Sequence, residues 1–531
     1  MPTTEFKPSA YQQAIFDWVT NGRGDAVVQA VAGSGKTTTL VQAAKLLNTK
    51  KATFVAFNKH VAKELQERLG DSMVCKTIHS VGMATLRSHL SKVSVDDNKY
   101  YDLAKPYAKE IAEGLYARYQ NDLRQWARYR NEDIPEPKEP PKASFITSQL
   151  KQLTHYCMVT LTPAADKAAV QETIDTFTCL DDSLDLNDLH YALQSLMREG
   201  ERVAANRGTI SYDDMLWLPH QWNLKPNKQE WIYIDESQDL SAAQLDLVLK
   251  MRGRGGRMLF VGDRSQAIYG FAGACSDSID RIIKRTKAIV LPLSICYRCP
   301  TAHIELAKKY VKQIEPAPNA IEGVVDEIHS NKVHEIVREG DLIVSRCTAP
   351  AVRLCIELIG KRIPARVRGR DIGRSLTALV REIGTHPEFD FDKFGKFLDE
   401  YRKDKIAKLE QKKNSQSQIE SLRDRCDGIA ACWQAFNSAS IDSFCLEIEE
   451  LFSDTRSSVV LSTVHRAKGL EEKRVFILRP DLLPLRWNGQ QDWELEQEYN
   501  LCYVAFTRAK EALCFIQDDI DEEEDDIGED D

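Results

Sequence analysis

The stretch AVAGSGKTTT at residues 30–39 constrains the fold of this chain more than any other feature. It follows a short apolar run at residues 26–31 and precedes residues 40–47, where apolar side chains recur at helical spacing. The local order is therefore strand, tight loop and helix. A phosphate-binding loop requires this context, and the alternative interpretation is a glycine-rich turn that leads into an ordinary helix.

Each residue type in this loop suits a polyphosphate. Gly33 and Gly35 allow the backbone to turn its amides toward phosphate oxygens, and the N-terminus of the following helix adds a positive dipole. Lys36 can reach the β and γ phosphates, and the Thr37 hydroxyl can bind a magnesium ion. The expected nucleotide-binding residues of the loop are Ala32, Gly33, Ser34, Gly35, Lys36, Thr37 and Thr38.

Paired carboxylates follow a later apolar strand. Residues 231–234 have the pattern of a buried strand, which ends in Asp235 and Glu236. Phosphoryl transfer after a phosphate loop needs carboxylates at this place. Asp235 can hold the magnesium hydration shell, and Glu236 can orient and deprotonate the attacking water.

Polar and aromatic residues near other predicted elements are further candidates. The strand at residues 258–261 leads to Gln266, which is placed to sense a γ-phosphate, and then to Tyr269 and Phe271, whose rings can stack on bases. Gln12 precedes the loop by about twenty residues, and its amide could read an adenine edge. A glutamine-rich N-terminal helix is the simpler interpretation of that segment.

Size and composition favour a soluble protein of several domains. With 531 residues the chain is long for a single core and suggests roughly two to four domains. No apolar stretch approaches the ~20 residues that span a bilayer, and residues 1–8 lack the apolar segment of a signal peptide. Thirteen cysteines without a repeating spacing favour reduced thiols. We therefore expect a cytoplasmic protein with no membrane partner.

Cys296 and Cys299 form the only tight cysteine pair in the sequence. A metal site would need a second pair or nearby histidines at ligand spacing, and the sequence offers neither. We therefore interpret the pair as a chance spacing.

The net charge of −9 is concentrated at the C-terminus. Residues 518–531 carry eleven acidic residues and no basic one, so the rest of the chain is nearly neutral and can present a basic groove. We expect this tail, counted from residue 517, to be disordered. It is either a solubilising end or an interaction tail that competes with DNA or docks a basic protein partner.

Six sequence blocks appear together in a fixed order: AGSGKT, IDESQD, VGDRSQAIYGF, YR, TVHRAKGLE and YVAFTRAK. Together they resemble the UvrD/Rep/PcrA family of superfamily 1 DNA helicases, and the resemblance spans about residues 9–516. It implies an α/β fold with two RecA-like parallel-sheet lobes, each interrupted by a mainly helical insert. ATP would lie between the lobes and single-stranded DNA across both.

The changes between α/β and helical patterns along the chain fall where this family has its inserts. The expected domains are a first lobe at 1–86 and 209–287, its helical insert at 87–208, a second lobe at 288–370 and 458–516, its short helical insert at 371–457, and the acidic tail at 517–531.

The resemblance also implies roles for individual residues. Gln12 would contact adenine, Tyr297 would stack on it, and Glu471 would meet the ribose. Arg298 and Arg508 would neutralise charge on the transferred phosphoryl group, so that hydrolysis requires lobe closure. Lys36, Asp235, Glu236 and Gln266 would complete the catalytic set, with Thr37 and Asp235 at the magnesium ion. The implied DNA contacts are Phe57, Asn58, His79, Tyr269, Phe271, Thr463 and His465.

These features predict an ATP- and Mg²⁺-dependent DNA helicase that moves 3′ to 5′ on single-stranded DNA and acts at duplex junctions in repair, recombination or replication. We expect a bacterial or phage origin. The alternative is a DNA-stimulated ATPase that strips proteins from single strands with little unwinding; an RNA helicase is a weaker one. The sequence departs from the family at Ala272, where an arginine is usual.

Overall fold

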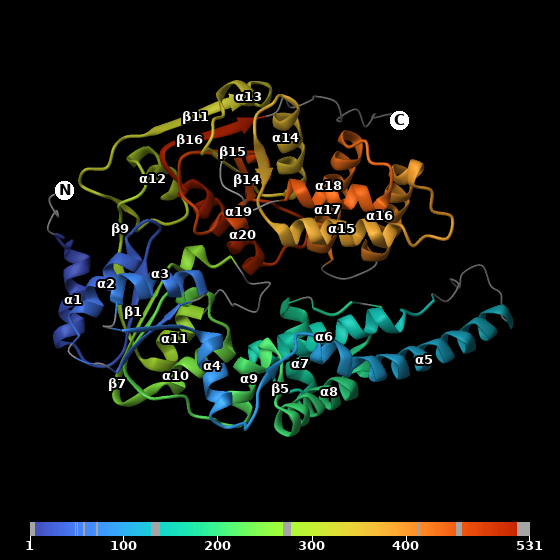
Figure 1. Ribbon diagram of the computed structural model, residues 1–531, viewed down its shortest axis with the longest axis horizontal. Coiled ribbons are helices and arrows are strands. Elements are labelled where there is room, and N and C mark those ends of the chain that lie inside the picture. The colour runs from blue at the N-terminus through green and yellow to red at the C-terminus, as the bar shows by residue number, and fades with distance from the viewer. Residues whose placement is uncertain are drawn as a thin grey trace, which may run out of the picture. The chain divides into compact units, whose positions relative to one another are not determined.

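The computed structural model describes residues 6–47, 49, 51–56, 59–70, 73–128, 139–177, 179–181, 183–268, 278–410, 415–452 and 459–517. The chain forms two compact units (Figure 1). The first unit is Met1–Ala30 with Lys36–Leu293, and the second is Val31–Gly35 with Ser294–Asp531. None of the helices in this described part of the chain combines the length and the apolarity that crossing a bilayer requires.

The first unit is built on a parallel six-stranded sheet with the strand order β3-β2-β6-β7-β1-β8. Its strands are β1 (Ala26–Ala30), β2 (Ala52–Ala56), β3 (Val74–Thr77), β6 (Gln229–Ile234), β7 (Arg252–Gly262) and β8 (Ile289–Leu293). The central strands are apolar and buried because helices cover both faces, as expected of a parallel sheet.

Two hydrophobic clusters fill the spaces between this sheet and its helices. One contains Ile15, Leu40 and Leu65, and the other contains Val248 and Ile279. The helices of this layer are α1 (Ala10–Asn21), α2 (Lys36–Lys45), α3 (Lys59–Leu69), α4 (Ile78–Arg87), α9 (Tyr212–Gln221), α10 (Ala242–Lys250) and α11 (Ser278–Thr286). This packing fixes the carboxyl ends of β1, β6 and β7 beside one another in strand order, which is the edge where open α/β sheets bind ligands.

The helical part of the first unit lies between two short strands, β4 (Ser94–Val95) and β5 (Thr209–Ile210), which pair with each other. It consists of α5 (Lys99–Arg128), α6 (Ala143–Thr160), α7 (Lys167–Phe177) and α8 (Leu186–Arg207) around a core of its own. In Figure 1, α5 extends as a long arm.

A buried polar network joins α5 to α9. Asp214 accepts hydrogen bonds from Lys99 Nζ at 2.6 Å, Tyr100 Oη at 2.7 Å and the Ser211 amide at 2.8 Å. Burial raises the pKa of Asp214 and lowers that of Lys99, while the charge of each partner opposes the shift in the other. The two charges of this network therefore depend strongly on each other, because both groups are buried.

The second unit is built on another parallel six-stranded sheet, with the strand order β11-β16-β15-β12-β14-β13. Its strands are β11 (Val324–His329), β12 (Leu342–Ser345), β13 (Ala365–Val367), β14 (Val459–Thr463), β15 (Glu472–Leu478) and β16 (Ala509–Gln517). The two parallel sheets confirm the predicted α/β fold with two RecA-like lobes.

The helices of the second unit are α12 (Thr301–Ala307), α13 (Val333–Ile336), α14 (Thr348–Gly360), α15 (Arg370–Ile383), α16 (Phe394–Glu410), α17 (Gln416–Ala435), α18 (Ile441–Leu451), α19 (Val464–Ala467) and α20 (Asp492–Phe506). One hydrophobic core links the sheet to α14–α18. Two further short strands, β9 (Ile295–Cys296) and β10 (Glu315–Pro316), pair with each other.

One predicted domain boundary differs from the structure. The prediction assigned residues from 288 onward to the second lobe, but β8 pairs with β1 over its whole length and belongs to the first sheet. The reason is physical: an apolar strand carries no signal in its own sequence for which neighbour it pairs with. The other domain boundaries stay predictions, and the acidic tail at 518–531 lies outside the described residues.

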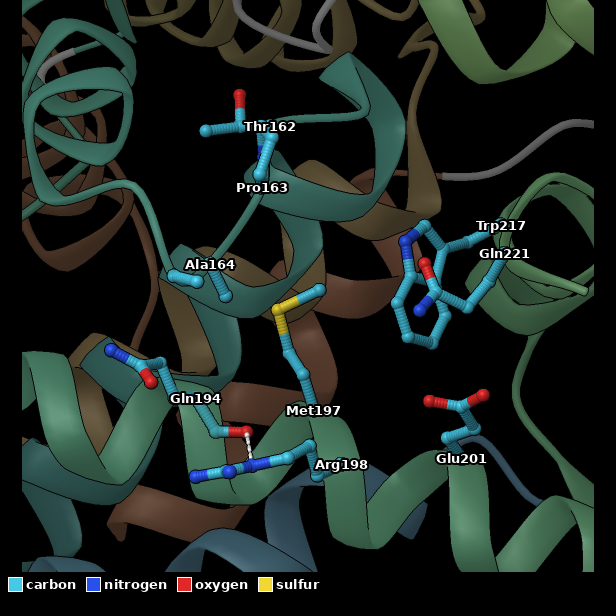
Figure 2. A pocket seen from close by; sticks show the side chains of 10 residues that line it. Thr162, Pro163, Ala164, Gln194, Met197, Arg198, Glu201, Trp217 and Gln221 are labelled. Atoms are coloured by element: carbon cyan, nitrogen blue, oxygen red, sulfur yellow. Dashed lines mark hydrogen bonds between the residues drawn. The ribbon is translucent and has the colours of Figure 1, made fainter.

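A cavity of about 270 Å³ opens in the helical part of the first unit, between the loop after α6, α8 and α9 (Figure 2). Met197 points into it, and Trp217 and Glu201 lie at its side. None of the sequence-predicted site residues lines this cavity. We therefore place the chemistry elsewhere, at the carboxyl edges of the sheets.

The Asp214 network generates a stability prediction. Asp214→Ala leaves Lys99 buried without its carboxylate, so we expect the free energy of unfolding to fall by about 3–5 kcal/mol. Urea unfolding followed by far-UV circular dichroism measures this loss. The matched control is Glu113→Ala. It removes an exposed ion pair to Lys109 within α5, the helix that carries Lys99, and should leave the unfolding midpoint unchanged. Equal effects of both substitutions would contradict the role given to the network.

Candidate nucleotide-binding and catalytic site

The first unit gathers one lysine and three carboxylates at the carboxyl edge of its sheet. Lys36 is the first residue of α2, Asp235 and Glu236 follow β6, and Asp263 follows β7. Lys36 Nζ lies 3.3 Å from Glu236 Oε2, and its side chain is only 13% exposed. The strand order β6-β7-β1 accounts for this grouping, because it brings together chain segments about 200 residues apart.

The electrostatics of this group are those of an anionic pocket around one cation. Burial by itself would lower the pKa of Lys36, but Glu236, Asp263 and Asp235 together outweigh it, so this pKa is raised. Burial, with Glu236 nearby, raises the pKa of Asp235 to about 7 although Lys36 opposes the shift. Burial also raises the pKa of Asp263. One lysine thus leaves the carboxylates under-compensated, and a divalent cation would complete the balance.

Glu236 adopts an unusual backbone conformation. Its φ angle is +49°, in the left-handed region that costs energy for a residue with a Cβ atom. Its carboxylate Oε2 accepts a hydrogen bond from Gln238 Nε2 at 2.6 Å in addition to Lys36. The strained turn and the two donors hold the carboxylate in one position beside Asp235.

The loop after β7 is tied to the same group. Gln238 Oε1 accepts the Asp263 amide at 3.1 Å, and Gln266 Nε2 donates to Asp263 Oδ2 at 2.7 Å. A Cβ atom at Gly262 would lie 2.5 Å from Gln238 Oε1, so this position requires glycine for the close approach. Gln266, expected at a γ-phosphate, therefore lies one hydrogen bond away from the carboxylate group.

Gln12 lies at the start of α1 with both polar ends of its amide engaged. Its Oε1 accepts the Ser9 amide at 2.9 Å in a capping box, and its Nε2 donates to Thr39 Oγ1 at 3.0 Å. Gln12 is thus linked to the helix that begins at Lys36. Its contact with adenine stays a prediction.

The residues expected to hold magnesium have suitable chemistry. Magnesium in such sites is bound by one or two carboxylate or hydroxyl ligands with phosphate and water completing the shell. The hydroxyl of Thr37 at the start of α2 and the carboxylate of Asp235 are oxygen ligands of this kind, and the excess negative charge favours a cation. Among the described residues, no group of three or more His, Cys, Asp or Glu side chains could hold a metal without such help.

The first five residues of the phosphate loop, Val31–Gly35, belong to the second unit. The Ala32 amide donates to Tyr503 Oη at 2.7 Å, and the Tyr297 amide donates to the Gly33 carbonyl at 2.9 Å. Gly33 has a φ angle of +66°, and a Cβ atom there would lie 2.6 Å from Arg298 Cβ. Glycine is required here both for the backbone conformation and for this contact.

Ser34 gives an independent sign that the loop suits a ligand. Its side chain is fully buried, and its Oγ has no hydrogen-bond partner among the described residues. A buried hydroxyl without a partner is costly, so the native protein normally provides one. A phosphate oxygen bound by the loop would satisfy it.

Two predicted arginines lie close together in the second unit. Arg298 forms an ion pair with Glu471, which also binds Lys510 Nζ at 2.8 Å. Arg508 is 1% exposed, and its guanidinium donates to the Val504 carbonyl at 2.8 Å and to Thr507 Oγ1 at 3.1 Å. Burial, with the charge of Arg298 nearby, lowers the pKa of Arg508 to about 10, so it stays charged at neutral pH. The predicted residues Arg298, Arg508 and Glu471 are thus brought together.

Tyr297, between Cys296 and Arg298 in sequence, is 49% exposed. Its side chain is free of the core and available for stacking, while its backbone is anchored to Gly33. This combination of an anchored backbone and an exposed ring suits the predicted stacking on adenine.

Of the predicted DNA contacts, the structure describes His79, Thr463 and His465. His79 is the second residue of α4, and burial lowers its pKa although Asp213 opposes the shift. Thr463 ends β14, and His465 follows in α19. Burial, with the charge of Arg346, lowers the pKa of His465 to about 3, so this ring is neutral near pH 7. Phe57, Asn58, Tyr269 and Phe271 lie outside the described residues, as does Ala272.

Sequence reasoning missed three residues that the structure places at the site. Asp263 adds a third carboxylate near Lys36, Gln238 positions both Glu236 and the Asp263 amide, and Tyr503 binds the loop amide of Ala32. All three lie inside the sequence blocks on which the resemblance rests. Their position inside these blocks was the signal that could have identified them. Which residues they contact could not be predicted, because those contacts join segments that are distant in the sequence.

Comparison with known proteins agrees with this geometry. The family profile of the UvrD/REP helicase N-terminal domain matches residues 12–287, and that of the UvrD-like helicase C-terminal domain matches residues 458–516. These two matches cover the loop, the carboxylates of the first unit and the Glu471–Arg508 region of the second.

Curated relatives share about a quarter of the aligned residues. The chain is 24% identical to the F-box DNA helicase protein 1 of Schizosaccharomyces pombe over 519 residues, covering 92% of this chain and 55% of that protein. It is 24% identical to the F-box DNA helicase 1 of Gallus gallus over 557 residues, covering 97% of this chain and 49% of that protein. It is 24% identical to the ATP-dependent DNA helicase PcrA of Staphylococcus aureus over 279 residues, covering 47% of this chain and 33% of that protein.

The chain therefore spans about half, or less, of the length of the curated relatives it matches. Eukaryotic proteins are among these relatives, so they do not support the expected bacterial or phage origin. The N-terminal domain profile alone covers more than half of the 531 residues. Because the profiles, the two parallel sheets and the geometry of the phosphate loop agree, this chain belongs to the UvrD/REP helicase family.

Proposed function

We propose that this protein hydrolyses ATP in a DNA-dependent manner and uses the energy to move along single-stranded DNA. The observation that carries the proposal is the contact between Lys36 and Glu236 beside Asp235 and Asp263, at the end of a phosphate loop. A lysine for the phosphates, a carboxylate for magnesium and a second carboxylate for the water are the parts that phosphoryl transfer requires.

In the proposed mechanism, the γ-phosphate competes with Glu236 for Lys36. Lys36 donates to Glu236, and a phosphate with several negative charges is a stronger acceptor for the ammonium group. Once Lys36 turns to the phosphate, Glu236 keeps its hydrogen bond from Gln238 and can accept a proton from water. Magnesium held by Thr37 and Asp235 would neutralise charge on the phosphates.

Gln266 offers a route from the nucleotide to DNA. It donates to Asp263, which itself lies near Lys36, and the segment that follows Gln266 contains the predicted DNA contacts Tyr269 and Phe271. We propose that γ-phosphate binding draws Gln266 away from Asp263 and that this change couples the nucleotide to DNA binding.

Arg298 and Arg508 would stabilise the transferred phosphoryl group. Both are paired, Arg298 with Glu471 and Arg508 with backbone carbonyls and Thr507. Each must give up part of these contacts to reach a phosphate. This exchange is a reason for hydrolysis to wait until nucleotide and DNA are both bound.

Movement in the 3′ to 5′ direction and duplex unwinding belong to the same proposal. The support is the helicase family of the chain and the names of its relatives, which are DNA helicases. Separating one base pair costs a mean of roughly 1.4 kcal/mol, so one ATP per step is ample. The same machinery would also serve a motor that removes proteins from single strands without unwinding.

The role of Glu236 generates the first functional prediction. Glu236→Gln removes the proton acceptor but keeps the size and the hydrogen-bonding oxygen, so we expect DNA-stimulated ATP hydrolysis to fall by about 10²–10⁴-fold. Binding of a fluorescent ATP analogue should persist. The matched control is Glu230→Gln, at an exposed residue of the strand β6 that precedes Glu236; this variant should hydrolyse ATP like the wild type. A Glu236→Gln variant with normal turnover would defeat the assignment of the base.

Polarity is tested with partial duplexes that differ only in the overhang. We expect ATP-dependent unwinding from a 3′ overhang and none from a 5′ overhang or a blunt duplex, measured by strand displacement on gels. ATP hydrolysis stimulated by single-stranded DNA without unwinding of any substrate would instead favour the protein-stripping motor. Displacement of a streptavidin block from a biotinylated single strand would then measure that activity.

The acidic tail at 518–531 is proposed to contact a basic surface, on a protein partner or in the DNA-binding groove of this chain. We expect truncation after Gln517 to raise the affinity for single-stranded DNA at low salt, with a smaller difference at high salt because charges are screened. Fluorescence anisotropy of a labelled single strand at several salt concentrations measures this affinity. Unchanged affinity at every salt concentration would exclude competition between the tail and DNA.

A further inference from the structure

The cysteine pair at residues 296 and 299 occupies a place that its sequence spacing does not reveal. Cys296 ends the short strand β9, and Cys299 lies three residues later in the turn that follows this strand. The Cys299 amide lies 3.4 Å from Cys296 Sγ, and Cys299 Sγ lies 3.6 Å from the Thr507 carbonyl oxygen. The two sulfur atoms are therefore held on the same side of a tight turn, in the second unit.

The turn between the two cysteines carries residues of the proposed nucleotide site. Tyr297 and Arg298 are the two residues that it contains. The Tyr297 amide donates to the Gly33 carbonyl, and a Cβ atom at Gly33 would lie 2.8 Å from Cys296 Sγ. One sulfur atom thus packs directly against the phosphate loop.

The surroundings distinguish Cys296 from other thiols. A hydrogen bond from the Cys299 side chain, together with the backbone amides of Cys299 and Arg298, lowers the pKa of Cys296 to about 7 although burial opposes this. Among the cysteines that the structure describes, every other one has a raised pKa, for example about 12 for Cys157 and Cys432. A lowered pKa favours the thiolate, which is the reactive form of a cysteine.

We propose that Cys296 and Cys299 form a reversible disulfide that switches off nucleotide hydrolysis at the phosphate loop. This inference rests on the proposed function, since it describes the regulation of that same site. It replaces the interpretation of the pair as a chance spacing, because the structure places one sulfur against Gly33 and a hydrogen-bonding thiol beside it.

The oxidation balances with a peroxide as the oxidant. The Cys296 thiolate attacks one peroxide oxygen, the O–O bond breaks, and a sulfenic acid and one water form after protonation. The Cys299 sulfur then attacks Cys296 Sγ, the S–O bond breaks, and the second water leaves with the thiol proton. Two thiols and one hydrogen peroxide thus give one disulfide and two waters. A dithiol such as thioredoxin would reverse the step by thiol–disulfide exchange.

Both cysteines are buried, but the turn that joins them reaches the surface, because Tyr297 is half exposed. A disulfide requires an S–S distance near 2.05 Å, so its formation draws the two ends of the turn together. It also removes the Cys299 thiol from the Thr507 carbonyl, an oxygen that also accepts Arg298 Nη1 at 3.3 Å. We expect Tyr297 and Arg298 to move with the turn.

The experiment uses the full chain in three states: reduced, oxidised with hydrogen peroxide, and oxidised then re-reduced with dithiothreitol. After free thiols are blocked, trypsin cuts after Arg298, so a disulfide leaves residues 288–298 joined to a peptide that begins at Cys299. We expect mass spectrometry to find these linked peptides in the oxidised sample only. DNA-stimulated ATP hydrolysis should fall by about 10–100-fold and return on re-reduction.

Two variants separate this switch from general oxidative damage. Cys296→Ala lacks the sulfur that peroxide oxidises and cannot form the disulfide, so its ATP hydrolysis, relative to its own reduced state, should resist the same treatment; Cys296→Ser serves in its place if the alanine variant does not fold. Cys75→Ser, a half-buried cysteine of β3, should remain as sensitive as the wild type. Absence of the linked peptides, or linked peptides with unchanged ATP binding and hydrolysis, would overturn the proposal.

Failure of the proposed function looks different from failure of the switch. A reduced protein that hydrolyses no ATP with or without DNA would defeat the proposed function. Binding of a fluorescent ATP analogue to the reduced and oxidised protein would then decide the switch by itself, since equal affinities in both states would overturn it.

Discussion

The site depends on one charge balance, in which a single lysine compensates three carboxylates. Lys36 lies at the start of α2, while Asp235, Glu236 and Asp263 are delivered by β6 and β7, which precede β1 in the strand order of the sheet. Three anions so close together cannot all stay ionised without cations nearby. Burial, with the charge of Glu236, raises the pKa of Asp235 to about 7 although Lys36 opposes the shift. The residual negative charge is the physical basis for binding a divalent cation with the nucleotide.

The phosphate loop and the helix that follows it make their contacts in different units of the chain. Lys36 and the residues after it pack with the first unit, whereas Val31–Gly35 pack with the second. Gly33 allows this because a side chain there would collide with Arg298 and Cys296. Within the second unit, the loop contacts Tyr297, Arg298 and Tyr503, although these residues are far from it in the sequence.

Much of the fold and of the first-unit site could be predicted from the sequence because each signal was local. The apolar runs before Lys36, Asp235 and Asp263 are strands, and the parallel sheets of the structure agree with the predicted α/β class. Other features required contacts between distant segments. The strand at residues 289–293 was assigned to the wrong lobe, because its apolar side chains fit either sheet. The hydrogen bond between Gln12 and Thr39 and the burial of Arg508 also depend on contacts between distant segments, so the sequence did not predict them.

The sequence by itself determined the chemical groups and their order: a phosphate loop, paired carboxylates, and arginines near the end of the chain. These are local because a loop, a strand and the residue that follows them are encoded within about ten residues. Only the tertiary structure decided which groups meet. It placed Asp263 near Lys36, turned Glu236 into a left-handed conformation, and brought Cys296 against Gly33. Strand order and the close packing of distant segments settle these contacts, and neither is written in any single stretch of the chain.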